Sequence, residues 1–290
     1  MEAMHASDPR RADVALAAVV DHLRLGGVPQ PRVDAELLLA HVLGVSRGRA
    51  QALALVGSSL SVAEAARFRE LGLRRGAREP LQHLTGVAHF RRIDLAVGPG
   101  VFVPRPETEV LVEHVLRLLP AGAGRIVDLG TGSGAIALSV ALERPDVEVV
   151  GVERSPDALP WTRRNAATVG APNARIVEGD LADAVPEWEG SVDVVVSNPP
   201  YVPDGMVPRD PEVDRFDPAV ALYGGADGLD PMRAVVATAE RLLRPGGGLA
   251  VEHGELQGEA VRALLGHRWV EAATHPDLTG RDRVTTARLR

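Results

Sequence analysis

The sequence predicts an α/β protein: a doubly wound, mostly parallel sheet with an antiparallel last strand, preceded by a small helical domain. Runs of β-branched apolar residues without polar alternation, typical of strands buried on both faces, recur through the second half of the chain. Segments with helical spacing separate these runs, as in a doubly wound fold. Four helical patterns without such strands fill the first 80 residues and predict a separate domain.

Composition limits the classes of protein to which the chain can belong. Its 290 residues suit one α/β domain with a smaller companion, and a hydrophobic content of 45% is ample for a core. The absence of cysteine excludes disulfides, thiolate metal sites and cysteine nucleophiles, and we expect no metal. The net charge of −7 disfavours broad binding to nucleic acid. Without a signal-like or membrane-spanning run, we expect a cytoplasmic protein that does not contact membranes.

The first domain, residues 1–80, consists of four expected helices. They cover residues 11–25, 31–43, 46–55 and a fourth segment that begins after Ser61. Gly44 is expected to end the second helix, and Ser46 and Ser61 are expected N-caps of the third and fourth. These helices carry no phosphate loop and no cluster of metal ligands, so we expect the domain to recognise a substrate.

Residues 81–106 are expected to form a β-hairpin that links the two domains. Residues 87–97 alternate in part with a period of two, and Gly98-Pro99-Gly100 supplies a turn before residues 101–103. An amphipathic helix follows and opens the larger domain, residues 107–290.

A glycine-rich loop follows the first strand of the larger domain. Residues 126–129 form a buried strand, and Gly130-Thr-Gly132-Ser-Gly134 connects it to an apolar helix. Glycines let a ligand approach the backbone, and the N-terminus of the helix presents free N–H groups. The next strand ends at Glu153, 23 positions beyond Gly130, near the spacing at which a carboxylate accepts from ribose hydroxyls. The loop therefore predicts a nucleotide-type site.

The same loop fits the G-x-G-x-x-[GA] pattern of nicotinamide and flavin dinucleotide sites, so a dinucleotide stays an alternative. Two features count against it. A dinucleotide fold holds its far nucleotide with a second mononucleotide half, whereas here the fourth strand ends in Asn198-Pro-Pro-Tyr201. The spacing Asp128-x-Gly130-x-Gly132-x-Gly134 also suits a cofactor without a pyrophosphate.

The fourth strand, residues 192–197, runs into Asn198-Pro199-Pro200-Tyr201. Proline fixes φ and supplies no N–H, so the two prolines restrict this loop to few conformations. Ligands of an open α/β sheet bind at the carboxyl ends of its strands. An amide and an aromatic ring held rigidly at that edge predict a functional site there rather than a simple turn.

The remaining segments continue the alternation of strands and helices. A strand at residues 174–177 leads to Gly179-Asp180. The irregular stretch from 202 to about 229 has a length often found in functional lids. Near the C-terminus, segments 269–273 and 283–288 can pair antiparallel, which predicts the antiparallel end of the sheet.

Together these motifs resemble the class I S-adenosylmethionine-dependent methyltransferases that act on planar amino groups and have a Rossmann-like sheet. Further features resemble the release-factor glutamine methyltransferases, the PrmC/HemK family: Phe102-Val-Pro-Arg-Pro-Glu-Thr-Glu109, Glu252-His-Gly254 and the helical N-terminal domain. The resemblance covers nearly the whole chain. It implies methyl transfer from S-adenosylmethionine to the side-chain amide nitrogen of the glutamine in the Gly-Gly-Gln motif of bacterial class 1 peptide chain release factors, without direct contact to nucleic acid.

The resemblance also implies roles for individual residues. The cofactor would contact Gly130, Thr131, Gly132, Ser133, Gly134, Glu153, Asp180, Leu181 and Asn198. The substrate would contact Phe102, Arg105, Asn198, Pro199, Pro200 and Tyr201, of which Asn198, Pro199 and Tyr201 would be catalytic. Two positions depart from the commoner family pattern, because Glu153 stands where Asp is usual and Leu181 where an aromatic often flanks the adenine. Glu153 can still accept from ribose hydroxyls, so its departure bears on affinity more than on cofactor identity.

The implied chemistry needs well-placed acceptors, because the lone pair of an amide nitrogen is delocalised into the carbonyl. The Asn198 side-chain oxygen and the Pro199 backbone oxygen would take both amide N–H bonds and stabilise the positive charge that develops on nitrogen. Tyr201 and Phe102 would enclose the flat amide and favour a nearby sulfonium. Neither a metal nor a strong general base is needed, since the sulfonium is already an activated leaving group.

Two other functions stay open. A methyltransferase for an exocyclic amine of a nucleic-acid base would use the same acceptors, but it would need a basic channel or a base-flipping surface. A catalytically silent cofactor-binding scaffold would use its helical domain to recruit a partner. Arg105 and Glu107 either pair with each other or contact the substrate, and His253 is expected to be structural.

Overall fold

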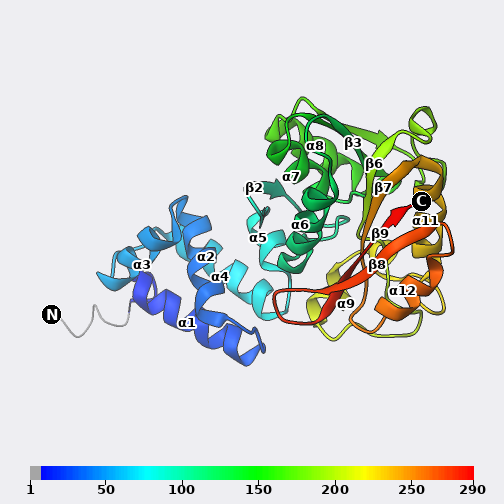
Figure 1. Ribbon diagram of the computed structural model, residues 1–290. Helices are drawn as coiled ribbons and strands as arrows, with labels where there is room; N and C mark the ends of the chain where they lie inside the picture. The colour runs from blue at the N-terminus through cyan, green and yellow to red at the C-terminus, as the bar shows by residue number, and fades with distance from the viewer. Residues whose placement is uncertain (1–7) are drawn as a thin grey trace. The chain divides into compact units, whose positions relative to one another are not determined.

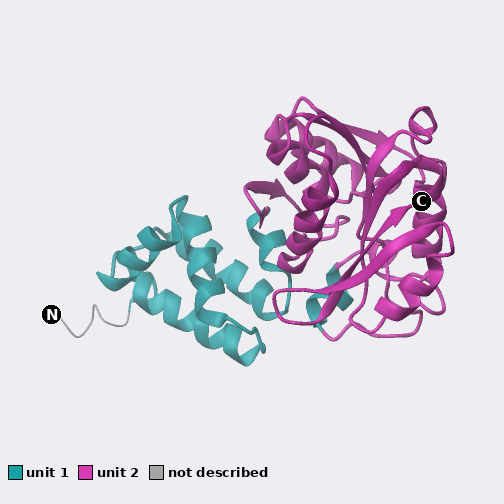
Figure 2. Cartoon of the chain, viewed as in Figure 1, with its two compact units in different colours: residues 1–86, 210–216 teal, residues 87–209, 217–290 magenta. Residues whose placement is uncertain are grey.

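The computed structural model describes residues 8–290; residues 1–7, with which the predicted helical domain begins, lie outside the described residues. The chain forms two compact units (Figures 1 and 2). Unit 1 runs to Gly86 and also takes in Asp210–Phe216, and unit 2 consists of Val87–Arg209 and Asp217–Arg290. Sequence patterns place residues 210–216 in the larger domain, whereas their contacts place them in unit 1. The domain roles inferred from the sequence stay predictions.

Unit 1 contains short helices, and the first four of them begin and end near the positions expected from the sequence. They are α1 (Ala12–Leu25), α2 (Pro31–Leu43), α3 (Arg47–Leu55), α4 (Val62–Gly76) and α5 (Leu81–Thr85). Ser61 and Glu64 form a capping box at the start of α4, and Gly44 ends α2 in the left-handed conformation with φ 63°. The short helix α5 is not predicted by the sequence patterns.

Aliphatic side chains form the core of unit 1. Its fully buried members include Leu16, Leu23, Leu38, Leu39, Phe68 and Leu71. Gly72 lets α4 approach α1 closely, because a Cβ at this position would lie 2.9 Å from Val19 Cγ1. The short helix α9 (Pro211–Phe216) completes the unit.

Unit 2 is built on a seven-stranded sheet with the strand order β5-β4-β3-β6-β7-β9-β8. Its strands are β3 (Gly124–Leu129), β4 (Val147–Glu153), β5 (Ala174–Glu178), β6 (Val192–Ser197), β7 (Leu243–Glu252), β8 (Trp269–Pro276) and β9 (Asp282–Leu289). β9 pairs antiparallel with β7 and β8, and the other pairings are parallel. The predicted doubly wound sheet with an antiparallel last strand is confirmed.

Helices cover both faces of this sheet. They are α6 (Glu109–Leu118), α7 (Ala135–Glu143) and α8 (Leu159–Val169) on one face, and α11 (Asp230–Leu242) and α12 (Gly258–Leu264) on the other. Ile126 and Val194 are buried with the first group, whereas their neighbours Val127 and Val195 are buried with the second. Successive strand residues point to opposite faces, which explains the unbroken apolar runs in the sequence. Among residues 8–290, no helix is both long and apolar enough to span a membrane.

The hairpin that precedes the sheet turns at a different place from the expected one. β1 (Val87–Phe90) and β2 (Ile93–Ala96) pair antiparallel, so the turn of the hairpin lies at Arg91-Arg92. The predicted turn at Gly98-Pro99-Gly100 is present, since Val101 N donates to Gly98 O at 3.4 Å, but the segments on its two sides do not pair as strands. Arg91 has φ 51°, a left-handed conformation that is rare for a residue with a side chain. Its guanidinium donates to both carboxylate oxygens of Glu143, at 2.5 and 2.7 Å. This distant contact holds the turn.

The stretch after Tyr201 is more regular than expected. It contains α9 and a further short helix, α10 (Ala219–Leu222). Val202 N donates to Leu222 O at 2.8 Å, and Gly224 N donates to Val202 O at 2.9 Å. The chain beyond α10 is therefore tied back to the residue that follows Tyr201.

Candidate active site

The strand order creates a switch point between β3 and β6. From β3 the chain moves outward to β4 and β5, and it then returns to the other side of β3 to form β6 and β7. Open α/β sheets bind ligands outside the carboxyl ends of the strands at such a point. The glycine loop follows β3 and the Asn-Pro-Pro-Tyr loop follows β6, and Ser197 Oγ donates to Leu129 O at 2.7 Å where the two strands end. The structure therefore brings both motifs to one edge.

The loop after β3 requires glycine at three positions. Gly130, Gly132 and Gly134 have φ of 73°, 57° and 87°, a region in which residues with a Cβ are strained. A Cβ at Gly130 or Gly132 would meet no atom within 4 Å, whereas one at Gly134 would lie 2.9 Å from Leu138 Cδ1. Gly130 and Gly132 thus leave the backbone open to a ligand, and Gly134 allows close packing at the start of α7.

Glu153, at the end of β4, ties this loop to the neighbouring strand. Its Oε2 accepts from Gly132 N at 2.8 Å, and its Oε1 accepts from Arg154 N and Ser155 N at 2.9 and 2.7 Å. Glu153 is only 8% exposed, and the three backbone donors offset the cost of burying its charge. The structure brings Glu153 to the glycine loop, and its contact with a ribose stays a prediction.

Asp128, next to the end of β3, supports the loop from within the protein. Its Oδ2 accepts from Thr131 Oγ1 at 2.6 Å and from Ala137 N at 3.2 Å, which joins the loop to the first turn of α7. Asp128 is fully buried, and burial raises its pKa to about 7. Asp128 therefore orients the loop through hydrogen bonds.

Asp180 and Leu181 follow β5 at the same edge of the sheet. Asp180 Oδ1 accepts from Ala182 N at 3.0 Å, and its Oδ2 pairs with Arg154 Nη1 at 2.9 Å. These two contacts lower the pKa of Asp180 below its usual value. Leu181 is half-buried and packs against the core of unit 2. Contact of either residue with a cofactor stays a prediction.

The Asn198 side chain is oriented by Thr108, which the sequence patterns do not single out. Asn198 Nδ2 donates to Thr108 Oγ1 at 3.3 Å. Thr108 is 4% exposed and ends the 3₁₀ turn Pro106–Thr108 just before α6. Because Nδ2 faces Thr108, the amide oxygen of Asn198 faces away from it. The next residue, Pro199, is buried, so its place beside Asn198 is fixed by packing.

Glu252 is a buried carboxyl beside Asn198. β6 and β7 are parallel with Ser197 paired to Val251, so Asn198 and Glu252 follow at the same level. Glu252 is 3% exposed; burial raises its pKa to about 7, and hydrogen bonds from the Thr108 and Asn198 side chains act in the opposite direction. Within residues 8–290, no hydrogen-bond partner is found for Glu252 Oε2. Glu252, Thr108 and Asn198 thus form one polar group at the strand ends.

Tyr201 is held at the end of the Asn-Pro-Pro-Tyr loop. Its backbone oxygen accepts from Gln257 Nε2 at 3.0 Å, and Gln257 Oε1 accepts from Gly254 N at 2.8 Å. Burial, with a smaller effect of the Glu252 charge, raises the pKa of Tyr201 to about 12. The phenol therefore stays protonated and can donate a hydrogen bond.

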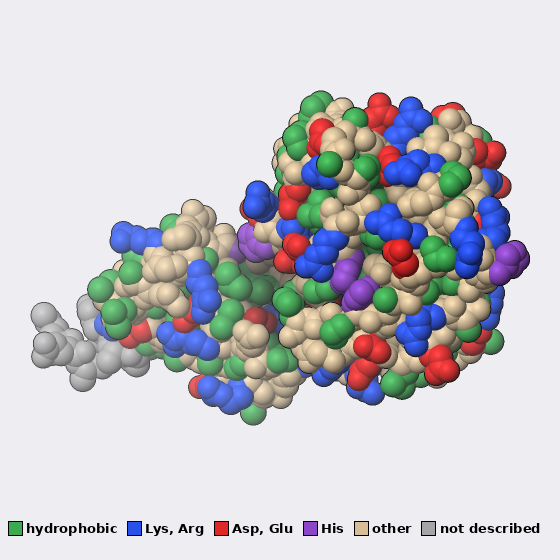
Figure 3. Space-filling model, in the orientation of Figure 1, with side chains coloured by type: hydrophobic (Ala, Val, Ile, Leu, Met, Phe, Trp, Pro, Cys, Tyr) green, Lys and Arg blue, Asp and Glu red, His purple; other side chains and the backbone are tan. Residues whose placement is uncertain are grey.

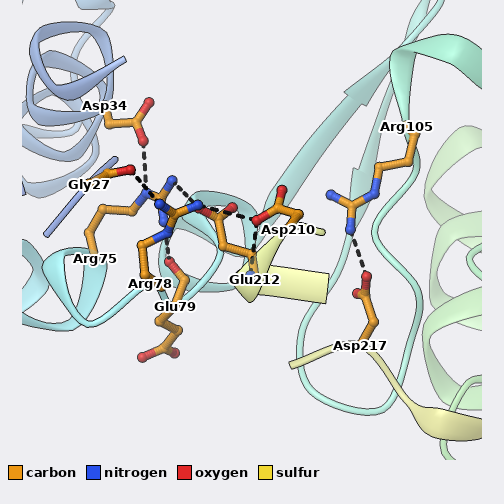
Figure 4. A network of polar contacts seen from close by, with 9 residues as sticks. All are labelled: Gly27, Asp34, Arg75, Arg78, Glu79, Arg105, Asp210, Glu212 and Asp217. Atoms are coloured by element: carbon orange, nitrogen blue, oxygen red, sulfur yellow. Dashed lines mark hydrogen bonds and ion pairs between the residues drawn. The ribbon is translucent and has the colours of Figure 1, made fainter. Parts of the chain in front are cut away.

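Arg105 lies between Phe102 and a buried acid. Its guanidinium carbon is 5.1 Å from the centre of the Phe102 ring. Its Nη2 pairs with Asp217 Oδ2 at 2.6 Å, and the Asp217 side chain is fully buried (Figure 4). Arg105 is expected from the sequence either to pair with Glu107 or to contact the substrate. Among the described residues it pairs with Asp217 and not with Glu107.

Sequence reasoning misses Asp217, and it quotes Thr108 and Glu252 only as parts of family motifs. Glu252 carries a usable signal, since it ends a buried strand at the edge that bears Asn198. The roles of Thr108 and Asp217 have no local signal in the sequence, because their partners Asn198 and Arg105 are distant in the chain. His253, expected to be structural, is fully buried. Its Nδ1 lies 2.9 Å from Gly254 O and its Nε2 lies 2.9 Å from Thr285 Oγ1.

Similarity to known proteins agrees with this architecture. Residues 14–86 match a family model described as the PrmC N-terminal domain, and residues 81–210 match the Methyltransferase small domain. The release factor glutamine methyltransferase of Streptomyces coelicolor is 47% identical over 279 residues, which cover 94% of this chain and 96% of that protein. The release factor glutamine methyltransferase of Mycolicibacterium smegmatis is 47% identical over 282 residues, which cover 96% of this chain and 97% of that protein. The chain belongs to the release factor glutamine methyltransferase family.

The fold of this release factor glutamine methyltransferase is also found in a solved structure. A methyltransferase from Pyrococcus furiosus is similar over 68% of this chain and 88% of that chain, with a TM-score of 0.51 and 20% sequence identity. At this identity the likeness shows the fold alone. The family membership and the fold together identify the chain as a methyltransferase, with its glycine loop and Asn-Pro-Pro-Tyr motif at one sheet edge.

Proposed function

We propose that this chain transfers the methyl group of S-adenosylmethionine to the side-chain amide nitrogen of the glutamine in the Gly-Gly-Gln motif of bacterial class 1 peptide chain release factors. The main support is the Asn198 amide, which Thr108 orients through Nδ2 at the edge that also carries the glycine loop. The names of the relatives from Streptomyces coelicolor and Mycolicibacterium smegmatis support the acceptor and the partner.

The residues after β3, β4 and β5 fit S-adenosylmethionine. Gly130 and Gly132 border open space, so the backbone there can be approached closely. We infer that residues 130–134 hold the amino-acid part of the cofactor, Glu153 the ribose, and Asp180 with Leu181 the adenine end. When bound, this cofactor supplies a methyl group activated by a positively charged sulfur.

Asn198 and Pro199 then act on the glutamine amide. The Asn198 side-chain oxygen and the Pro199 carbonyl each accept one N–H, which directs the lone pair of the nitrogen towards the methyl group. As the N–C bond forms and the C–S bond breaks, positive charge develops on the nitrogen, and the two acceptors stabilise it. The methylated nitrogen then releases a proton to water.

Glu252 supports the same orientation of Asn198. Its carboxyl accepts a hydrogen bond from the Asn198 side chain, and Nδ2 is the only part of that side chain that can donate one. Tyr201 and Phe102 are proposed to enclose the flat glutamine amide, with Arg105 holding Phe102 through their contact of 5.1 Å.

Surface charge favours a protein acceptor over a nucleic acid. The chain has a net charge of −7, and on the face of each unit seen in Figure 3 the basic and acidic side chains are interspersed. A base methyltransferase would instead need a continuous basic path for the phosphates. We propose that residues 1–80 recognise the release factor, that 81–106 link the domains, and that the enzyme acts in the cytoplasm, where translation termination takes place.

The direct experiment is methylation of a purified release factor. The full-length chain is incubated with S-adenosylmethionine and the factor, and the Gly-Gly-Gln peptide is analysed by mass spectrometry. We expect one added methyl group on the glutamine, and none on a factor in which that glutamine is replaced by alanine. An unmodified glutamine together with a methylated nucleic acid would contradict the proposal.

A further inference from the structure

A segment inserted between parts of unit 2 is held in unit 1 by charged side chains. The chain leaves unit 2 after Arg209, forms α9 and re-enters unit 2 at Asp217. No residue of α9 is fully buried, and its apolar side chains Val213 and Phe216 are half-buried, so apolar packing alone is a weak restraint on this helix. Ion pairs also hold it, as Figure 4 shows.

Arg75 of α4 is at the centre of these ion pairs. Its side chain is 5% exposed. Its Nε donates to Asp34 Oδ2 and its Nη2 to Glu212 Oε1, both at 2.7 Å. Its Nη1 donates to Glu79 O at 3.0 Å. One buried guanidinium therefore joins α2, α9 and the end of α4, and each of its three nitrogens has a partner.

Arg78 makes a second contact with the same segment. Its Nη2 lies 3.0 Å from Glu212 Oε1 and 3.2 Å from Asp210 Oδ1, and its Nη1 donates to Gly27 O. The Glu212 side chain is only 13% exposed and is shared by two guanidinium groups. Loss of one partner from such a buried network leaves an uncompensated charge, so the network resists opening.

The stretch that contains α9 is also held at both ends within unit 2, beside the candidate active site. Before α9, the backbone oxygen of Tyr201 accepts from Gln257. Directly after α9, Asp217 pairs with Arg105, which contacts the Phe102 ring. Phe216 ends α9 and Asp217 is the next residue, so one peptide bond joins the helix to the partner of Arg105.

We propose that Arg75 and Arg78 are positioning residues for methyl transfer: by holding Glu212 they fix the chain at Asp217 and so keep Arg105 and Phe102 in place at the substrate edge. The kinetic part of this inference rests on the proposed function, whereas the restraint on α9 can be measured without any substrate. The helical unit thereby has a second role besides docking a protein partner.

The test uses the full-length chain with Glu212→Ala, and Asp214→Ala as its matched control. Both variants remove one carboxylate from α9, but Asp214 is exposed and forms no ion pair within the described part of the chain. Trypsin cleaves after arginine, and Arg215 lies within α9. We expect roughly tenfold faster cleavage after Arg215 in Glu212→Ala, because the local opening becomes easier, and a wild-type rate in Asp214→Ala.

Activity is then measured at saturating release factor. We expect kcat of Glu212→Ala to fall by about fivefold to tenfold, with the KM for S-adenosylmethionine unchanged. Arg78→Gln removes one of the two positive charges that hold Glu212, and it should reproduce both the faster cleavage after Arg215 and the lower kcat. A thermal melt of each variant shows whether unit 1 and unit 2 stay folded.

Each result bears on one part of the inference. Wild-type cleavage after Arg215 in Glu212→Ala would overturn the restraint. Faster cleavage with unchanged kcat, and a raised KM for the release factor alone, would overturn the positioning role and leave unit 1 with docking only. A wild-type enzyme that does not methylate the release factor would contradict the proposed function, while the cleavage rates would still decide whether the arginines hold α9.

Discussion

Asn198 Nδ2 lies 3.3 Å from Thr108 Oγ1, a contact that joins the loop after β6 to the turn before α6. The two ends of an asparagine amide have nearly the same shape but opposite hydrogen-bonding roles, so this contact decides where the oxygen points. Glu252, 3% exposed, favours the same orientation, because it accepts a hydrogen bond from the Asn198 side chain and only Nδ2 of that side chain can donate one. The direction of the Asn198 oxygen is therefore set by residues outside the Asn-Pro-Pro-Tyr motif.

Thr108→Val should slow methyl transfer without affecting cofactor binding. Valine keeps the shape of threonine but removes the hydroxyl that fixes the amide, and one hydrogen bond is worth about 1 kcal/mol, so kcat should fall roughly fivefold to tenfold. Thr108→Ser keeps the hydroxyl and should stay close to wild type. The orienting role would be excluded by a serine variant as slow as the valine variant, or by equal loss of S-adenosylmethionine affinity in calorimetry.

Gly132→Val should abolish cofactor binding by placing a side chain where the backbone must be approached. Its φ of 57° also strains a residue with a Cβ, so Gly170→Val, with φ 67° and equally open surroundings at the end of α8, is the matched control. Each variant should lose about 1–2 kcal/mol of unfolding free energy. Calorimetry should show lost S-adenosylmethionine affinity for Gly132→Val alone, and wild-type affinity in that variant would remove the loop from the site.

Asp128 should make stability fall as pH rises towards neutrality. Its pKa is raised from 3.8 to about 7, so the folded state binds this proton more tightly than the unfolded state does. The stabilisation is full below the unfolded value and is lost as pH rises through the folded value. Between about pH 5 and about pH 8, urea unfolding of wild type should lose roughly 1–3 kcal/mol more than that of Asp128→Asn. Parallel pH profiles for the two proteins would show that Asp128 is ionised throughout.

A chain that begins near residue 80 should keep cofactor binding and lose activity on intact release factor. The glycine loop, Glu153 and Asn198 all lie in unit 2. The shortened chain also lacks Arg75 and Arg78, so its loss of activity would combine lost docking with a released α9. Undiminished turnover would show that unit 1 is needed neither for docking the release factor nor for restraining α9.

Local patterns were sufficient for the parts of the fold that local chemistry determines. Ser61 and Gly44 mark helix ends because their caps use neighbouring backbone groups. Four of the six residues of the strand before Asn198 are valine, because both faces of this strand are buried. The position of the hairpin turn depends instead on a distant residue. Arg91 takes a left-handed conformation held by Glu143, 52 residues away, and no neighbouring residue in the sequence indicates this conformation.

The candidate site likewise contains some residues that sequence patterns reveal and others that they do not. Glycines and Asn-Pro-Pro-Tyr are visible in the sequence because backbone conformation and a rigid loop need those residue types at fixed spacing. The residues that orient them are not, since Thr108 lies 90 positions from Asn198 and Asp217 lies 112 from Arg105. The contact between Arg75 and Glu212 spans 137 positions. Such pairs are determined by the folded topology and have no periodic signal.

The central claim is that Asn198 orients the substrate amide and stabilises the charge that develops on it. Asn198→Ala removes this acceptor and leaves the glycine loop, Glu153 and both prolines unchanged. Asn198→Asp keeps an acceptor but adds a charge and loses the donor to Thr108, so it should retain partial activity.

The most direct measurement is kcat and KM of Asn198→Ala on a release factor, beside its affinity for S-adenosylmethionine. Loss of one preorganised transition-state hydrogen bond predicts a kcat reduced by roughly 10²–10³-fold, with cofactor affinity little changed. A variant that keeps wild-type kcat and shows only a raised KM would mean that Asn198 contributes uniform binding, and it would contradict the mechanism.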